Sequence, residues 1–383
     1  MSIESNFFTK AVHAGTRPEP VTGAIMTPIF QTSTYVQSEP GVHKGFDYSR
    51  ANNPTRQAYE EALATIENAK HALSFSSGIA AEQAIIQTLD ANAEVIVCDD
   101  VYGGTGRLFR QLFSKYGIKF HFVDMHDDKA IKDVLNKNTK LIWMESPTNP
   151  TMKIIDIKKM AALAKNAGAY LVVDNTFATP ALQNPLDMGA AFVLHSTTKY
   201  IGGHSDVIGG AVMINDEDLF KKVKFVQFAA GAVPSPMECF MLLRSIKTLA
   251  VRVDRHCDNG ERVASYLAES KKVSAVYYPG LANDRGHGIA KAQMRRFGGM
   301  ISFDHAGSYD DVVAFFKKLK VYSLAESLGG VESLVNHPAL MTHASVPTEL
   351  RKKLGIGPNL VRLSCGIESA DDLIADLDQA LNS

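Results

Sequence analysis

The sequence predicts an α/β protein with a mainly parallel sheet, an arm before it and a smaller α+β domain after it. Short apolar runs alternate with helix-like segments from about residue 54 to residue 245. Apolar strands separated by helices are typical of a parallel sheet that is covered on both faces. The pattern changes after about residue 245, where one long helical stretch precedes shorter strand-like runs. The length of 383 residues also fits two or three domains.

Residues 1–53 are predicted to form an arm, because they contain several prolines and glycines and show no helical period. A long segment of this kind is either disordered or ordered by another surface. Its apolar and aromatic content favours an ordered arm packed on a partner, since disordered segments have fewer such residues. The residues concerned are Ile25, Met26, Ile29, Phe30, Tyr35, Phe46 and Tyr48.

Residues 54–245 are predicted to form the large domain. Its first helix covers 54–71, with Pro54 in the first turn, where proline is favoured. Ligands of such sheets bind beyond the carboxyl ends of the strands. The expected strands are 93–98, 118–123, 140–145, 169–174, 190–194 and 209–214. Further helices are expected at 79–89, 106–116, 127–137 and 156–167.

Residues 246–383 are predicted to form the smaller α+β domain. It begins with a long, charged helical stretch that extends from Ser245 to Ser270. Shorter strands are expected after this helix, at 273–278, 299–303 and 360–364.

Composition and missing motifs exclude several classes of function. A formal net charge of −1 gives no electrostatic reason to expect nucleic acid or an anionic membrane as partner. Four widely spaced cysteines without a C-x-x-C pair argue against a zinc cluster or disulfide framework, so we expect no metal site. The lack of a signal-peptide pattern and of a long apolar segment predicts a cytoplasmic protein. Without a G-x-G-x-x-G or Walker motif, a dehydrogenase or nucleotide-binding enzyme is disfavoured.

Lys199 and Asp174 are the strongest candidates for chemistry. An apolar run that ends at Leu194 leads into three hydroxyl side chains and then the amine of Lys199. Another apolar run, Tyr170–Val173, ends on Asp174. An aldehyde cofactor requires an amine to form a Schiff base, a carboxylate to hold a pyridine nitrogen protonated, and hydroxyls to bind a phosphate. The pair therefore indicates pyridoxal 5'-phosphate (PLP).

Each of the supporting residues has a competing interpretation. A buried Asp174 requires a cation, such as a pyridine ring nitrogen, but Asp also caps helices. Ser77 and Gly78 at a helix start can bind a phosphate, although Ser-Gly also caps ordinary helices. Tyr102 can stack on a cofactor ring or simply pack a loop. Arg362 suits bidentate capture of a carboxylate, with a structural salt bridge as the alternative.

Taken together, these stretches resemble the PLP-dependent transsulfuration enzymes: cystathionine γ-synthase, cystathionine γ-lyase, cystathionine β-lyase and methionine γ-lyase. The similarity extends through nearly the whole chain. It is carried by Tyr48-Ser49-Arg50, Asn53-Pro54-Thr55, Ser77-Gly78, Asp100–Thr105, Pro147–Pro150, Asp174-Asn175-Thr176, Ser196–Tyr200, Glu326–Gly330, Met341–Ala344 and Arg362-Leu363-Ser364.

The resemblance implies the aspartate-aminotransferase-like fold (fold type I) with a seven-stranded sheet. It also implies a homotetramer, a dimer of dimers whose active sites are shared across each close dimer. Lys199 and Tyr102 would be catalytic. The implied cofactor-binding residues are Lys199, Asp174, Ser77, Gly78, Ile79, Tyr102, Ser196 and Thr198, with Tyr48 and Arg50 from the neighbouring subunit. The implied substrate-binding residues are Arg362, Ser327 and Asn149 for the α-carboxylate, and Arg107 and Glu326 for the distal end.

Cystathionine γ-lyase is the leading member implied by the resemblance. The Glu326–Gly330 stretch is closer to the γ-synthases and γ-lyases than to the β-lyases, and Gly104 stands where methionine γ-lyases carry cysteine. The γ-synthase and β-lyase reactions stay open as alternatives. A PLP-binding regulator without catalysis is an alternative of another class, and the presence of both Lys199 and Tyr102 counts against it.

Overall fold

The larger sheet fixes where the site lies. The computed structural model describes residues 6–344 and 346–382, and residues 1–5 of the predicted arm lie outside them. Within the described residues, seven strands pair in the order β1-β7-β6-β5-β4-β2-β3. They are β1 (His71–Phe75), β2 (Glu94–Cys98), β3 (Lys119–Val123), β4 (Thr139–Glu145), β5 (Tyr170–Asp174), β6 (Phe192–Ser196) and β7 (Gly210–Ile214).

Five neighbouring strands of this sheet, from β3 to β6, are parallel, and β7 is antiparallel to both β6 and β1. The predicted mainly parallel, seven-stranded sheet is therefore confirmed. In the register of β4, β5 and β6, Glu145 lies opposite Asp174, and Asp174 lies opposite Leu194. The last residues of these strands thus lie at one edge of the sheet. Ligands of parallel α/β sheets bind at this edge, beyond the carboxyl ends of the strands.

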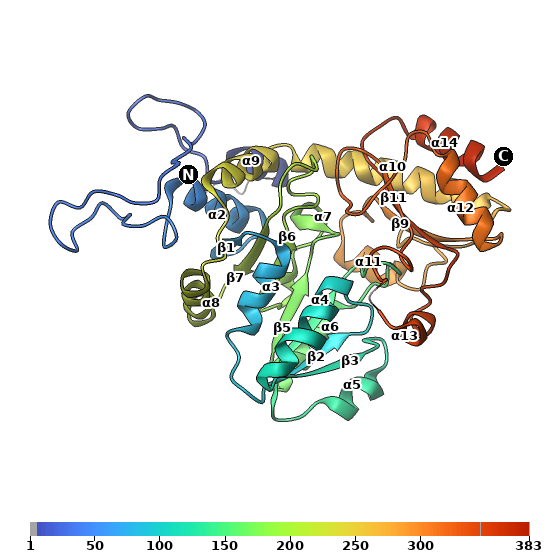
Figure 1. Ribbon diagram of the computed structural model, residues 1–383, viewed down its shortest axis with the longest axis horizontal. Coiled ribbons are helices and arrows are strands. Elements are labelled where there is room, and N and C mark those ends of the chain that lie inside the picture. Colours follow the sequence, from blue (N-terminus) through green and yellow to red (C-terminus); the bar gives the residue numbers. More distant parts are fainter. Residues whose placement is uncertain (1–5, 345, 383) are drawn as a thin grey trace.

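Helices surround this sheet, some from the segments that connect its strands and others from the segments before β1 and after β7 (Figure 1). They are α2 (Pro54–Ile66), α3 (Gly78–Ile86), α4 (Gly103–Arg107), α5 (Asp128–Val134), α6 (Ile157–Asn166), α7 (Thr179–Leu182), α8 (Glu217–Ala230) and α9 (Pro236–Ile246). A π-helical turn at Leu108–Leu112 and 3₁₀ turns at Phe113–Tyr116 and Pro185–Met188 complete the set. No helix of the described residues is long and apolar enough to cross a membrane.

Two local predictions are corrected. The predicted helix 54–71 ends at Ile66, and its last residue, His71, instead begins strand β1. This edge strand was missed because it is short and contains Ser74 and His71. Its pairing with β7 and its packing against α2, α3 and α8 identify it as a strand. The arm also contains a helix, α1 (Phe7–His13), which is capped by Asn6, buries Ala11 and packs on α2.

A second sheet follows in the C-terminal part. Among the described residues it has five strands in the order β10-β11-β12-β9-β8, mostly antiparallel. The strands are β8 (Val273–Tyr277), β9 (Met300–His305), β10 (Ser323–Leu324), β11 (Leu334–Asn336) and β12 (Leu360–Ser364). The helices are α10 (Leu249–Glu269), α11 (His287–Gln293), α12 (Tyr309–Lys318), α13 (Thr348–Lys353) and α14 (Ala370–Asn382).

Helix α10 connects the two sheets. In Figure 1 it extends from α9 to the orange and red elements of the C-terminal part. Leu249 and Val253 on its first turns belong to the core of the larger sheet, and Val263 and Leu267 belong to the core of the second sheet. One helix thus packs into the cores of both sheets and fixes them relative to each other. The domain boundary near residue 245 stays a prediction.

Arg252 of α10 ties this helix to the loop that carries Lys199. Its buried guanidinium donates to the carbonyl oxygens of Tyr200 at 2.6 Å, Ile201 at 3.3 Å and Ser245 at 3.0 Å. Carbonyls buried without a donor cost free energy. The arginine therefore stabilises the loop next to the site as well as the helix.

We expect Arg252→Met to lower the free energy of unfolding by about 3 kcal/mol, because it removes the donor of the Tyr200 and Ile201 carbonyls, whereas Thr248 still donates to Ser245. Urea unfolding followed by the fluorescence of Trp143, the single tryptophan of the chain, measures this. Arg255→Met is the control, since Arg255 is exposed on the same helix. Equal losses in the two variants would contradict the role of Arg252.

Candidate active site

A cavity of about 230 Å³ lies at the carboxyl edge of the larger sheet and is closed by residues of the C-terminal part. It brings together most of the residues predicted from the sequence. The predicted residues that line it are Ser77, Gly78, Ile79, Tyr102, Asn149, Asp174, Ser196, Thr198, Lys199, Glu326, Ser327 and Arg362.

Lys199 follows β6 by three residues and points its amine across to the C-terminal part. Its Nζ donates to Ser327 Oγ at 2.8 Å. Burial, and then the charge of Arg362, lower the pKa of Lys199 to about 8, with Glu326 acting in the opposite direction. An amine with this pKa is partly neutral near physiological pH and can act as a nucleophile.

Asp174 closes β5 and faces the same cavity. Its Oδ1 accepts a hydrogen bond from the backbone N–H of Thr176 at 2.9 Å. Burial raises the pKa of Asp174, while the hydrogen bonds from Thr176 and the charge of His195 oppose the rise. A buried carboxylate that lines a cavity is suited to pair with a cation inside it.

The start of α3 and the turn after β6 form a cradle for an anion. Ser77 caps α3, its side chain accepting from Ala80 N at 3.0 Å, so the first N–H groups of the helix are available to a ligand. A Cβ on Gly78 would lie only 3.0 Å from Ser196 Cβ, so glycine lets the two segments approach. The hydroxyl-bearing Ser196 and Thr198 complete the cradle.

Arg362 enters the cavity from β12 of the second sheet. Its guanidinium donates to Asn149 Oδ1 at 2.8 Å and to the carbonyl oxygen of Ser327 at 2.9 Å. Its buried Nε has no partner among the described residues. Burial lowers the pKa of Arg362 to about 10, so the group stays charged near neutral pH. A charged guanidinium with a free N–H donor can bind a carboxylate.

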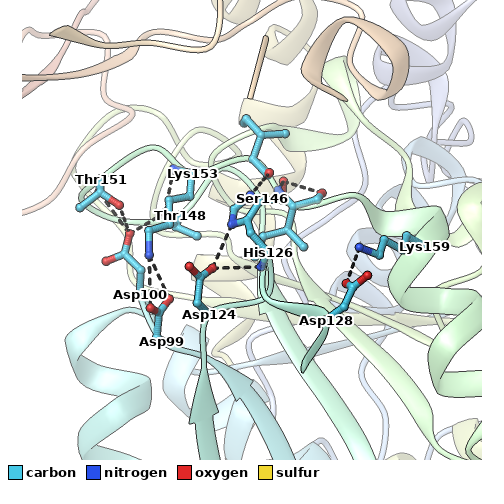
Figure 2. A network of polar contacts seen from close by, with 12 residues as sticks. Asp99, Asp100, Asp124, His126, Asp128, Ser146, Thr148, Thr151, Lys153 and Lys159 are labelled. Carbon is cyan, nitrogen blue, oxygen red and sulfur yellow. Dashed lines mark hydrogen bonds and ion pairs between the residues drawn. The ribbon is translucent and has the colours of Figure 1, made fainter. Parts of the chain in front are cut away.

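The turn that carries Asn149 is held by a polar network (Figure 2). Asp100 accepts from Thr148 Oγ1 at 2.6 Å and from the hydroxyl of Thr151. Lys153 pairs with the neighbouring Asp99 at 3.1 Å. Both aspartates follow β2, so the larger sheet sets the position of the amide that orients Arg362.

Tyr102 covers the cavity from the start of α4. Its backbone N–H donates to Glu145 Oε1 at 2.6 Å. A Cβ on Gly104 would lie 2.4 Å from Tyr102 Cε1, so the ring rests directly on a glycine. Burial, then the charge of Glu82, raise the pKa of Tyr102, which keeps the phenol protonated at neutral pH.

Two carboxyl groups of the cavity, Glu82 and Glu145, were not predicted. Glu145 ends an apolar strand as Asp174 does, so the same signal could have found it. Glu82 is a single charged residue within the apolar helix α3, and the sequence alone gives no signal that it faces a ligand.

Three predicted residues are not among the described residues that line the cavity: Tyr48, Arg50 and Arg107. Tyr48 and Arg50 lie on the arm, where Arg50 Nη1 donates to the carbonyl oxygen of Phe228 at 2.7 Å. Arg107 is exposed at the end of α4, and its charge lowers the pKa of Tyr102. Among the described residues, no group of three or more His, Cys, Asp or Glu could hold a metal ion.

The residues of the cavity fit PLP. The amine of Lys199 suits its aldehyde, Asp174 suits its ring nitrogen, and the start of α3 suits its phosphate. The phenol ring of Tyr102 can stack on the pyridine ring of the cofactor. The fold and this pocket thus define a PLP-dependent enzyme with the aspartate-aminotransferase-like fold.

Comparison with known proteins identifies the family. The model of the Cys/Met metabolism PLP-dependent enzymes matches residues 8–382, and the chain belongs to this family. It is 48% identical over 380 residues to a cystathionine beta-lyase of Coxiella burnetii, covering 99% of this chain and 98% of that one. It is 49% identical over 375 residues to a cystathionine gamma-lyase of Dictyostelium discoideum, covering 98% of this chain and 97% of that one.

A solved structure agrees with this assignment. The cystathionine gamma synthase of Xanthomonas oryzae pv. oryzae, in complex with aminoacrylate and cysteine, matches with a TM-score of 0.97 and 41% identity, covering 99% of this chain and 98% of that one. The predicted PLP cofactor, fold type I and transsulfuration-family membership are confirmed.

We expect the rate at which the cofactor-free protein captures PLP to rise about tenfold between pH 7 and pH 9, because only the neutral amine of Lys199 attacks an aldehyde. Growth of the visible absorbance after mixing measures the rate. Glu326→Gln should lower the pH at which the capture rate is half of its maximum, the midpoint, below that of the parent, since the Glu326 charge raises the pKa of Lys199. Glu217→Gln, on the exposed start of α8, is the control. A midpoint that is the same in all three proteins would contradict this coupling.

Proposed function

We propose that this protein is a cystathionine γ-lyase, which converts cystathionine and water to cysteine, 2-oxobutanoate and ammonia. The observation that carries the proposal is the meeting of Lys199, Asp174 and Arg362 in one cavity. These side chains provide the three functions that an amino-acid substrate of a PLP enzyme requires: an amine that exchanges with the substrate, a partner for the ring nitrogen, and a carboxylate site.

Substrate orientation depends on the two ends of cystathionine. The unpaired Nε of Arg362 is available to the α-carboxylate of the reacting half, and Asn149 and Ser327 hold the guanidinium in place. The negative charge of Glu326 in the cavity wall attracts the ammonium of the distal half. The exposed Arg107, whose charge acts on Tyr102 of the cavity wall, would meet the distal carboxylate.

Proton transfer is assigned to Lys199 and Tyr102. Bound PLP supplies an electron sink for the carbanion that forms at Cα. Lys199 Nζ, which donates to Ser327 Oγ at 2.8 Å, would be the base that takes the Cα proton of the bound substrate. Loss of a γ-substituent also needs a proton shift at Cβ, which Lys199 and the phenol of Tyr102 share. A β-lyase needs no such second shift.

Two other reactions have specific support. The Coxiella relative, at 48% identity, is named a cystathionine beta-lyase, whose products would be homocysteine, pyruvate and ammonia. The Xanthomonas structure is a cystathionine gamma synthase, which would join cysteine to an activated homoserine. We place the γ-lyase first because of the Glu326–Gly330 stretch, and the substrate position within a few Å decides which bond breaks.

Product analysis separates these reactions. We expect the holoenzyme with cystathionine to release cysteine and 2-oxobutanoate, measured by chromatography and a keto-acid assay. Homocysteine with pyruvate would instead establish the β-lyase, and cystathionine formed from an O-acylhomoserine and cysteine would establish the synthase. A PLP absorbance without any of these products would indicate a non-catalytic PLP-binding regulator.

We expect Lys199→Ala to lower turnover by at least about a thousandfold, because it removes the amine that exchanges with substrate and moves protons. Steady-state kinetics and circular dichroism would show lost activity with an intact fold. Lys158→Ala, on the exposed face of α6, should retain parental turnover. Near-normal turnover in the Lys199 variant would contradict the assignment.

The assembly is proposed to be a homotetramer whose sites are completed by the arm of a neighbour. In Figure 1 the arm extends away from the body of the chain near α2 and α9. Its apolar side chains are uncovered, with Val36 96% and Val21 88% exposed, and Phe225 on α8 is 69% exposed. Apolar surface of this kind favours an interface. A second copy would cover it and bring Tyr48 and Arg50 to the phosphate.

We expect Arg50→Ala and Lys199→Ala to complement each other. Each variant alone should be nearly inactive, the first through weak PLP retention. Co-expression should restore about a quarter of parental activity, because each mixed dimer has one intact shared site. Activity assays of the purified mixture measure this. No recovery in assemblies shown by mass spectrometry to contain both chains would contradict a shared site.

A cytoplasmic location belongs to the same proposal. All four cysteines, within the described part of the chain, are buried and free of disulfides. Free thiols suit a reducing compartment. Cell fractionation with an antibody against the chain tests this location.

A further inference from the structure

Glu82 is a carboxyl group in the cavity wall for which the proposed chemistry has no use. It lies on α3, one turn after Gly78, and is only 3% exposed. Its Oε1 accepts from Thr105 Oγ1 at 2.9 Å, whereas its buried Oε2 has no hydrogen-bond partner among the described residues. Buried polar atoms are paired with few exceptions. The partner of Oε2 therefore comes from whatever fills the cavity.

Glu82 shares this cavity with two other buried acids, Asp174 on β5 and Glu145 on β4. Burial raises the pKa of all three, and the charge of Asp174 is the next cause for both glutamates. Carboxyl groups that are crowded in a low-dielectric site cannot all be ionised. At least one of the three therefore holds a proton.

Hydrogen-bond donors decide where that proton resides. Asp174 accepts a backbone N–H from Thr176, and Glu145 accepts one from Tyr102, and both bonds stabilise an ionised carboxylate. Glu82 accepts only a hydroxyl, that of Thr105. Glu82 is consequently the acid that is most easily protonated, and its unpaired Oε2 is the oxygen free to carry the proton.

We propose that Glu82 is a further cofactor-binding residue: a neutral carboxylic acid whose Oε2–H donates a hydrogen bond to the PLP held by Lys199 and Asp174. The inference rests on the proposed cofactor site and deepens it. A neutral Glu82 satisfies its own buried oxygen and leaves Asp174 to carry the negative charge that faces the ring nitrogen.

Two substitutions of Glu82 test the hydrogen bond. Glu82→Gln keeps an acceptor for Thr105 and offers an N–H donor to the cavity, so its dissociation constant for PLP should stay within about threefold of the parent. Glu82→Met has a similar length and no donor, so its dissociation constant should rise about tenfold. Absorbance titration of the cofactor-free proteins measures both constants. A Met variant that binds PLP as tightly as the parent would overturn the proposal.

Glu94→Gln is the matched control for these titrations. Glu94 is also a buried glutamate, but it begins β2 at the opposite end of the strands and bonds to His121 and Asn136. Its substitution should leave the dissociation constant for PLP unchanged. An equal loss of affinity in this variant would show a general structural effect and overturn the specific role of Glu82.

Infrared difference spectra provide a readout that a structural role would not change. The parent should show the carbonyl stretch of a protonated carboxylic acid, and this band should shift when PLP is added. Glu82→Gln should lack the band. A band that persists in the Gln variant, or that does not respond to PLP, would overturn the proposal even if the Met variant fails to fold.

The same measurements separate this inference from the cofactor site itself. A parent protein that binds no PLP would refute the site, and with it the role of Glu82. A second outcome would refute the role of Glu82 alone. In that outcome the parent binds PLP with a visible absorbance band that Lys199→Ala loses, and the Glu82 variants bind PLP as the parent does.

Discussion

Strands β4, β5 and β6 pair in parallel, and the whole active site depends on their register. Because Glu145 lies opposite Asp174 and Asp174 lies opposite Leu194, the ends of three strands open on one edge of the sheet. A shift by one residue would turn each closing side chain to the other face. The apolar strands, buried on both faces, prevent such a shift, so hydrophobic packing sets the geometry of the polar site.

The site concentrates groups that are costly to bury. Asp174, Glu82 and Glu145 share a cavity with the amine of Lys199 and the guanidinium of Arg362. Burial is the largest cause of every pKa shift among these five groups. The same desolvation that destabilises the charges also makes Lys199 a usable nucleophile and gives a bound cofactor and substrate strong electrostatic partners.

Two parts of the chain have to meet before the site exists. The larger sheet supplies Lys199 and Asp174, and β12 of the second sheet supplies Arg362. Ser327 joins the two parts, because its hydroxyl accepts from Lys199 and its carbonyl accepts from Arg362. Its backbone φ of 84° is uncommon for a residue with a side chain. Helix α10 and Arg252 keep the two parts in this arrangement.

The sequence by itself determined the α/β class, most strand positions, the PLP chemistry and the pair of Lys199 and Asp174. These follow from local patterns, namely apolar runs, their closing residues and motif order. Only the tertiary structure decided that His71–Phe75 is an edge strand, and that Glu82 turns into the cavity. The partner of an edge strand and the direction in which a helical side chain points depend on residues that are distant in sequence, so no local pattern encodes them.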